Sequence, residues 1–409
     1  MRFAAFLAPH HLPGESPALQ LQRDLDLVVH LDRLGFDEFW CGEHHSTGWE
    51  TIGSPEMFLA AAAVRTGRIM LGTGVTSIPY HHPFNVAQRI VQLDQMSFGR
   101  AMLGTGPGAL PSDAHTLGID PMVLRDRQDE AIPVIQRLLA GGERFTYECD
   151  WFQMYDAKLQ ILPYQRQIPM ATASMISPSG MTLAGKHSLG VLSVGSMSTE
   201  GLASLPLQWS FAEDAAAKHD GTVNRADWRV MFNFHVARTR DQARRDVEHG
   251  LLQWHNDYNV ATLQRPGLQP LSSTAEAIDF YANPDTSAGV IGTPDDLIEN
   301  ILLMQEITGG FGVMMGFVND WAEPEAMFRS WDLVARHVIP AVNGQLAPMV
   351  ESNEHVIANR EYFDRAGKAI LAKIFENERA AAALEGAGTP KSGFTPPLNA
   401  AEPARSSPG

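Results

Sequence analysis

The stretch FWCGEHHSTGWE, Phe39 to Glu50, brings a carboxylate and two adjacent imidazoles together directly after a short apolar run. Glu43, His44 and His45 are candidates for three roles: metal ligands, a base or proton shuttle with its orienting partner, or the polar end of a strand. An imidazole beside a carboxylate titrates near neutral pH, as general acid–base catalysis requires. The spacings His-x-His and His-Glu-x-x-His, which metal hydrolases use, are both absent. We therefore predict proton handling, and no metal, at these residues.

Glycines follow two further apolar runs. Gly74 and Val75 lie in LGTGVTSIP, and Gly104 and Gly106 lie in GTGPG. Without side chains, such glycines leave bare backbone against which a flat ring can lie. The plain alternative is a tight turn between a strand and a loop, and GTGPG lacks the spacing of the dinucleotide fingerprint.

Hydroxyl groups mark the beginning of a later helical segment. Ser177, Ser179 and Gly180 lie in SMISPSGMTLAG, where a helix is expected to begin. Hydroxyls and free backbone N–H groups at a helix N-terminus suit a phosphate group. Ordinary helix capping is the alternative. Because no Gly-x-Ser-x-Gly elbow occurs, hydrolysis through a covalent intermediate is disfavoured.

The elements that must position these residues alternate between short apolar runs and longer helical patterns. Eight such strand–helix units predict an α/β fold, a TIM-type (β/α)8 barrel, whose active site lies at the carboxyl ends of the strands. A doubly wound open sheet is the alternative, but the first strand leads into APHHLPGESP, which lacks a dinucleotide fingerprint. The predicted strands are 2–8, 36–42, 68–79, 100–108, 168–174, 189–197, 228–238 and 311–318.

The barrel is predicted to span residues 1–343, with a lid-type insertion at about 263–290 that contains proline and serine. A single helix is expected over 239–258, just before that insertion. Residues 344–384 are expected to form a helical C-terminal extension, with one helix over 359–384. Residues 385–409 are rich in proline, glycine, serine and alanine, which predicts a disordered tail.

The net charge of −16, from 47 acidic and 31 basic residues, argues against a nucleic-acid partner. No apolar run is long enough to span a membrane. The two cysteines, Cys41 and Cys149, are expected to be reduced thiols. We therefore expect a soluble, cytoplasmic protein.

Several segments, in this order, resemble the bacterial luciferase-like, flavin-dependent monooxygenases. They are LGFDEFWCGEHHS, SPEMFLAAAAVRTGRIMLGTGV, HPFNVAQRIVQLDQMSFGRAMLGTGPG and GTPDDLIENILLMQEITGGFGVMMGF. The resemblance covers residues 1–343, and the branch that includes limonene monooxygenase-like enzymes is the most similar. It implies a (β/α)8 barrel that binds a reduced flavin and uses dioxygen to oxygenate a small, largely apolar substrate. FMN is favoured over FAD.

The resemblance also implies roles for individual residues. His44 handles protons, with Glu43 and His45 beside it. Gly74-Val75 matches a non-proline cis peptide under the flavin ring. The serine positions and Gly180 match the flavin phosphate site, and 263–290 matches a mobile lid.

One departure concerns the phosphate. The luciferases have an arginine at the position of Pro107, so the resemblance implies that another cation, Lys186 or Arg125, takes its place. A cluster of apolar residues near the strand ends suggests either an apolar pocket or barrel core: Phe6, Trp40, Met175, Met197 and Phe234.

The resemblance implies partners as well. Because no pyridine-nucleotide fingerprint is present, a separate NAD(P)H flavin reductase would supply the reduced flavin, and a homo-oligomer such as a dimer is expected. Two alternatives stay open: a deazaflavin-dependent hydride-transfer enzyme of the same superfamily, and a non-catalytic flavin-binding barrel.

Overall fold

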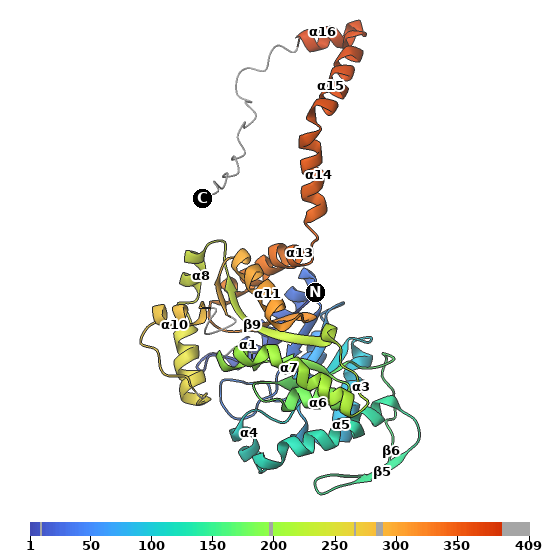
Figure 1. Cartoon of the computed structure of the whole chain (residues 1–409), viewed down its shortest axis with the longest axis vertical. Helices are drawn as coiled ribbons and strands as arrows, with labels where there is room; N and C mark the ends of the chain where they lie inside the picture. Colours follow the sequence, from blue (N-terminus) through green and yellow to red (C-terminus); the bar gives the residue numbers. More distant parts are fainter. Residues whose placement is uncertain (9, 196–198, 266, 284–288, 387–409) are drawn as a thin grey trace. The chain divides into compact units, whose positions relative to one another are not determined.

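Eight parallel strands close into the predicted barrel (Figure 1). The computed structural model describes residues 1–8, 10–195, 199–265, 267–283 and 289–386. Around the barrel the order is β9-β11-β1-β2-β3-β4-β7-β8, and β8 pairs back onto β9. The strands are β1 Arg2–Leu7, β2 Glu38–Cys41, β3 Met70–Ser77, β4 Ala101–Gly106, β7 Met170–Ser174, β8 Gly190–Ser193, β9 Trp228–Val236 and β11 Val313–Val318. The predicted fold class is therefore confirmed.

Helices cover the outer face of this barrel, and the larger core lies between the two layers. Many begin with proline in the first turn, where its missing N–H has no partner to lose. α11, Pro294–Thr308, begins with a capping box between Thr293 and Asp296. The helices that pack on the barrel are α1 Pro17–Leu34, α2 Pro55–Ala63, α3 Pro83–Met96, α5 Leu124–Ala140, α6 Ser179–His187, α7 Thr199–Lys218, α11 and α12 Pro324–Leu333.

A second core fills the inside of the barrel. At its lower end, the buried guanidinium of Arg229 donates from Nε to Glu38 Oε2 at 2.6 Å and from Nη2 to Glu38 Oε1 at 2.9 Å. Glu38 Oε2 also accepts from Trp40 Nε1 at 2.8 Å. The buried charges of Arg229 and Glu38 are thus paired and hydrogen-bonded, as buried charges must be. The Trp40 ring lies on the next layer, against Gly72 and Gly104.

The predicted single helix over 239–258 is wrong. The chain forms α8 Arg240–Asp246, then the short α9 Leu251–Gln253 and a π-helix at Trp254–Thr262. The break occurs at Gly250, whose N–H donates to the Trp321 carbonyl at 2.9 Å. A side chain at Gly250 would overlap the Asp320 carbonyl, so this glycine allows close contact with the loop after β11. Tertiary packing here overrides the local helical pattern.

Three further elements were not predicted. β5 Phe145–Glu148 and β6 Gln153–Ala157 form an antiparallel hairpin, and the three-residue strand β10 Val290–Gly292 pairs with the end of β9. The 263–290 insertion contains a helix, α10 Thr274–Tyr281, while residues 266 and 284–288 of it lie outside the described residues. Its role as a lid stays a prediction.

Residues Gln345–Gly409 form a second compact unit, separate from Met1–Gly344. Its described part has three helices, α14 Ala347–Ala358, α15 Arg360–Phe375 and α16 Glu378–Gly386. The predicted single helix over 359–384 is therefore wrong, because the chain leaves helical geometry after Phe375. The predicted disordered tail lies almost entirely outside the described residues. None of the described helices has the length and apolar character needed to cross a membrane.

Candidate active site

A cavity of about 300 Å³ opens at the carboxyl ends of the barrel strands. Its apolar wall includes Phe6, Leu192, Val194, Met231 and Phe317. Its polar side includes residues that follow β2, β4 and β7. This is where active sites of parallel barrels lie, and Glu43 and His44 both line it.

The predicted apolar pocket residues divide between this cavity and the core. Phe6 and Met175 line the cavity. Trp40 is fully buried in the barrel interior, and Phe234 points outward, where its ring meets Trp331 edge-on at 4.8 Å. These two are therefore core residues, since β-strand side chains alternate between the two faces. Met197 lies outside the described residues.

Glu43 is the centre of a buried hydrogen-bond cluster. Its Oε1 accepts from His45 Nε2 at 2.9 Å and from His81 Nε2 at 2.6 Å, and its Oε2 accepts from the Ser77 N–H at 2.8 Å. Burial alone would raise the pKa of Glu43, but the hydrogen bonds from His45 and His81 outweigh it and lower that pKa. The bond to Glu43 in turn raises the pKa of His45. Glu43 therefore orients His45 and stays ionised.

His44 lies between two carboxylates that the sequence did not single out. Its Nδ1 is 3.1 Å from Asp113 Oδ2, and its Nε2 is 3.4 Å from Glu50 Oε1. Burial would lower the pKa of His44, but Glu50 and Asp113 raise it above its ordinary value. Asp113 also accepts from the His45 N–H at 3.0 Å.

Asp113 and Glu50 were missed because neither lies in a recognisable motif. Asp113 lies 69 residues from His44 in the sequence, and α4 Pro111–Thr116 brings it there. Glu50 is the last residue of the stretch that begins at Phe39, in a loop. One signal was available: both residues follow predicted strands, at the end of the barrel where sites occur.

Bare backbone forms one side of the cavity. The peptide between Gly74 and Val75 is cis, and both residues line the cavity, as does Gly106. Gly104 lies deeper: a side chain there would meet the Thr73 carbonyl and the Trp40 ring. Gly104 thus makes room for the core beneath the cavity and is not among the lining residues.

A neighbouring cavity of about 360 Å³ leads to the N-terminus of α6 and shares Ser177, Ser179, Gly180 and Arg125 with the first. The hydroxyls of the two serines are 2.8 Å apart. Gly180 lets the helix lie against β7, since a side chain would be 2.8 Å from Ser174 Cα. Hydroxyls and free N–H groups at this helix end fit an anionic group.

Of the two candidate cations, Lys186 is already paired with Asp129, at 2.7 Å. Arg125 lines both cavities, is exposed, and forms no ion pair or hydrogen bond with the part of the chain that the structure describes. Arg125 is therefore the better candidate for binding a phosphate.

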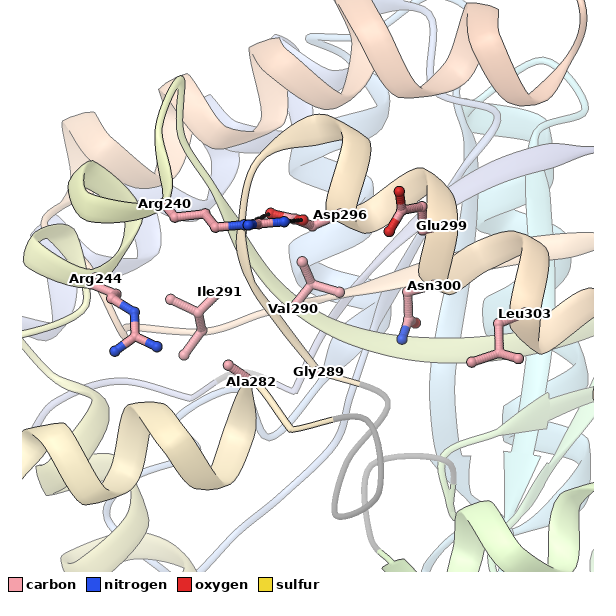
Figure 2. A pocket seen from close by; sticks show the side chains of 10 residues that line it. All are labelled: Arg240, Arg244, Ala282, Gly289, Val290, Ile291, Asp296, Glu299, Asn300 and Leu303. Atoms are coloured by element: carbon pink, nitrogen blue, oxygen red, sulfur yellow. Dashed lines mark hydrogen bonds and ion pairs between the residues drawn. The ribbon is translucent and has the colours of Figure 1, made fainter. Parts of the chain in front are cut away.

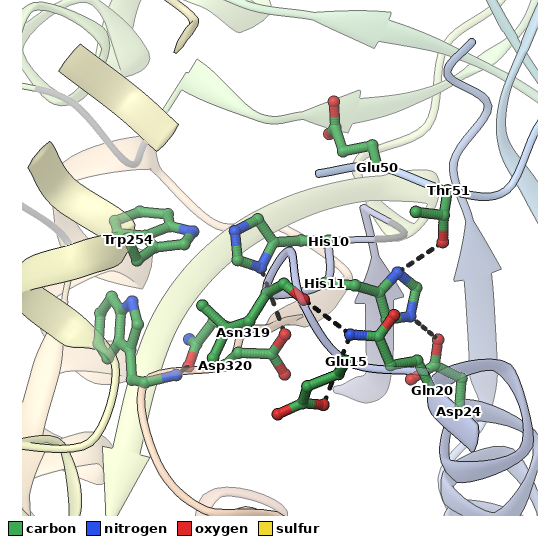
Figure 3. A network of polar contacts seen from close by, with 12 residues as sticks. His10, His11, Glu15, Gln20, Asp24, Glu50, Thr51, Trp254, Asn319 and Asp320 are labelled. Carbon is green, nitrogen blue, oxygen red and sulfur yellow. Dashed lines mark hydrogen bonds and ion pairs between the residues drawn. The ribbon is translucent and has the colours of Figure 1, made fainter. Parts of the chain in front are cut away.

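A network of aromatic rings and charged groups around His10 and Asp320 (Figure 3) lies next to the cavity, which Tyr258 and Glu50 line. His10 stacks on Trp49 at 5.4 Å and meets the Tyr258 ring at 4.6 Å. Asp320 lies 3.5 Å from His10 Nδ1 and 3.0 Å from Arg23 Nη1. The network thereby joins the loops after β1 and β11 to α1.

A separate cavity of about 400 Å³ lies between α8, α10, β10 and α11 (Figure 2). Arg240 on its rim pairs with Asp296 at 2.5 Å. None of the predicted site residues lines it.

Comparison with known proteins places this geometry in a family. The sequence profile of the luciferase-like monooxygenases matches residues 1–309. The chain is 48% identical over 348 residues to a 4-hydroxyprotoasukamycin monooxygenase of Streptomyces nodosus subsp. asukaensis, covering 84% of this chain and 93% of that protein. It is 46% identical over 381 residues to a limonene 1,2-monooxygenase of Rhodococcus erythropolis, covering 92% and 97%.

A solved structure shares the fold. It is the oxygenating constituent of 3,6-diketocamphane monooxygenase from Pseudomonas putida, a type II Baeyer–Villiger monooxygenase in complex with FMN. The TM-score is 0.72 at 25% identity, covering 83% of this chain and 98% of that one. The chain belongs to the luciferase-like monooxygenase family and is an oxygenating oxidoreductase.

Proposed function

We propose that this chain is a flavin-dependent monooxygenase that uses reduced FMN and dioxygen to insert one oxygen atom into a small, largely apolar organic substrate. One observation carries the proposal. The cavity beside His44 and the cavity at the α6 N-terminus share a wall, and together they have the size of a cofactor site. The relatives' names support an apolar substrate, and the FMN bound to the solved relative supports FMN.

The residues present fit an FMN molecule. Arg125, the two serine hydroxyls and the α6 N-terminus would hold its phosphate, and the backbone at Gly74-Val75 would face its ring system. When bound, the reduced flavin supplies the electrons that activate dioxygen. The apolar wall excludes water from the reacting atoms, and Glu43 holds His45 while His44 handles a proton at Nε2.

The direct test is turnover by the full chain. Purified chain, FMN, a flavin reductase with NADH and a panel of cyclic alkenes and ketones are incubated under ¹⁸O₂. We expect a product heavier by one labelled oxygen atom, formed only when the reductase is present. Oxygen consumption without a labelled product from any panel member, together with no FMN binding, would contradict the proposal.

FMN affinity tests the phosphate site separately. Arg125→Ala removes the free guanidinium, and a hydrogen bond to a charged group contributes about 1.5–3 kcal/mol. Because Arg125 is exposed, we expect the lower end, an increase in the FMN Kd of about tenfold. The matched control is Arg127→Ala, since Arg127 lies two residues on in α5 and its guanidinium lies 5.3 Å from the centre of the Trp151 ring. If both variants raised the FMN Kd equally, the proposal that Arg125 binds the FMN phosphate would be wrong.

The reductase and a homo-oligomer are part of the same proposal. Exposed apolar side chains on α14 and α15 support self-association, among them Met349, Ile357, Tyr362 and Ile370. Light scattering of the full chain should give at least twice the monomer mass of 44.8 kDa. A monomeric mass at micromolar concentration would contradict it.

A further inference from the structure

His44 differs from a simple carboxylate–histidine pair because a second carboxylate faces its other nitrogen. In a pair with one carboxylate, that group fixes Nδ1–H, and Nε2 presents a lone pair that serves as a base. Here Asp113 is 3.1 Å from Nδ1 and Glu50 is 3.4 Å from Nε2. A lone pair on Nε2 would face a negatively charged oxygen, so this geometry favours a hydrogen on both nitrogens.

Both carboxylates are deeply buried, which strengthens their effect. The side chains of Asp113 and Glu50 are 1% and 4% exposed. Electrostatic interactions of buried groups are screened less than those at the surface. The Glu50 main chain is held in place, because its N–H donates to Thr47 Oγ1 at 3.2 Å and it forms a β-bridge with His10. Figure 3 shows Glu50 beside Thr51.

Glu50 has hydrogen-bonding capacity left over. Its Oε2 is buried and receives no hydrogen bond of ordinary geometry from the described residues. Burial raises the pKa of Tyr258, on the π-helix, and the charge of Glu50 together with a contact between the tyrosine hydroxyl and that carboxylate raises it further. Glu50, His44 and Tyr258 all line the cavity. A buried carboxylate without a full set of donors is costly, which fits a role in the site.

The charged groups around His44 are mostly negative. Glu50 approaches from the loop after β2, Asp113 from α4 and Glu43 from the end of β2, and together they outweigh the effect of burial on the His44 pKa. Arg265 and Tyr258 also line the cavity. An opposite charge within about 4–6 Å moves the midpoint of a titration by about one to three pH units.

We propose that Glu50 is a positioning residue that keeps His44 protonated on both nitrogens, so that His44 acts as a proton donor at Nε2 and not as a base. The donor role rests on the proposed function: a monooxygenase releases one oxygen atom of dioxygen as water, so a proton must reach the site. His44 gives up its Nε2 proton there and regains one from solvent between turnovers. The protonation state of His44 does not depend on that function.

The test is a histidine titration of the full chain by NMR. The protein is labelled with ¹⁵N-histidine, and the His44 signals are identified by their loss in His44→Gln. In the wild type we expect both ring nitrogens to be protonated at pH 7. Glu50→Gln, which keeps the shape and removes the charge, should lower the His44 midpoint by at least about one pH unit, a tenfold change in proton affinity.

The matched control is Glu56→Gln, since Glu56 is also buried, on α2, outside the cavity. It should leave the His44 midpoint unchanged. A second variant, Glu50→Asp, keeps the charge but moves it away from His44 Nε2. It should therefore lower the His44 midpoint by less than Glu50→Gln does. It also replaces Glu50→Gln as the test if that variant does not fold. A neutral His44 in the wild type at pH 7, or equal midpoints in all variants, would overturn the inference.

Kinetics separate the two proposals. If the chain oxygenates substrates, the alkaline limb of its kcat profile should move to lower pH in Glu50→Gln and return part of the way in Glu50→Asp, with the FMN Kd within about twofold. An absence of oxygenation would contradict the proposed function and leave the NMR result standing. An unmoved NMR midpoint with normal oxygenation would contradict only the role of Glu50.

Discussion

Replacing Glu43 by glutamine should destabilise the barrel substantially, although the two side chains have nearly the same shape. Glu43 is 1% exposed and accepts three hydrogen bonds. If the amide oxygen of the new side chain faces the two histidines, its NH₂ group faces the Ser77 N–H. The Ser77 N–H then has no acceptor, because both groups are donors. If the amide is turned around, His45 and His81 lose their acceptor.

The magnitude follows from these contacts. One buried donor without an acceptor costs about 1–3 kcal/mol, and weakening the charge-assisted bonds adds about 1–2 kcal/mol. The expected loss is about 2–5 kcal/mol. The barrel unit, Met1–Gly344, has an unfolding entropy of about 0.7 kcal/mol per kelvin by the usual per-residue value. Glu43→Gln should therefore lower the Tm by about 3–7 °C at pH 7.

The pH dependence provides a sharper check. Because hydrogen bonds hold the folded pKa of Glu43 below 4.5, its charge stabilises the fold above pH 4.5, and this contribution is lost as the pH falls through the folded pKa. A protonated Glu43 resembles glutamine, so the Tm difference between wild type and variant should shrink in acid.

Scanning calorimetry at several pH values measures this difference. The control is Glu143→Gln at an exposed site, which should change the free energy of unfolding by less than about 0.5 kcal/mol. A Tm loss that equals the control, or one that stays constant down to acid pH, would refute the reasoning.

Three further variants probe other parts of the fold. Glu38→Ala leaves the Arg229 guanidinium buried with a missing partner, so thermal melts should show a loss of about 3–5 kcal/mol. Gly180→Val places a side chain against the β7 backbone, so α6 must move; the FMN Kd measured by fluorescence should rise at least about tenfold, with a stability loss of about 1–3 kcal/mol. Gly67→Ala, in open space, should change neither. In Arg240→Ala, NMR should show the pKa of Asp296 rising from about 2 toward 3.8, while the exposed pair contributes less than about 1 kcal/mol; the Asp296 charge stabilises above pH 3.8, and that contribution is lost as the pH falls through about 2.

The eight barrel strands could be predicted because parallel strands are buried on both faces and therefore appear as continuous apolar runs. All six residues of β11, for example, are buried. β10 could not be found this way. It has three residues, and its strand geometry depends on pairing with the end of β9, which no local pattern records.

The candidate site was predictable where a motif carried the chemistry. Gly74, Val75, Gly106 and the α6 N-terminus line connected cavities, as expected for a ring and a phosphate. Their roles in binding stay predictions. The carboxylates around His44 were not predictable, because a pairing distance depends on how loops fold over the barrel mouth. Arg125 could be selected over Lys186 only after the structure showed that Asp129 already neutralises the lysine.

Beneath the cavity, the large Trp40 ring packs directly against two glycines, Gly72 and Gly104. Trp40 occupies the barrel interior only because Gly72 and Gly104 leave that space open. Evolution or engineering cannot change these positions one at a time: a side chain at Gly72 requires a smaller residue at Trp40. Conversely, a smaller residue at Trp40 would deepen the cavity beneath the Gly74-Val75 backbone. Homologues that accept longer substrates are therefore expected to show correlated changes at these three positions.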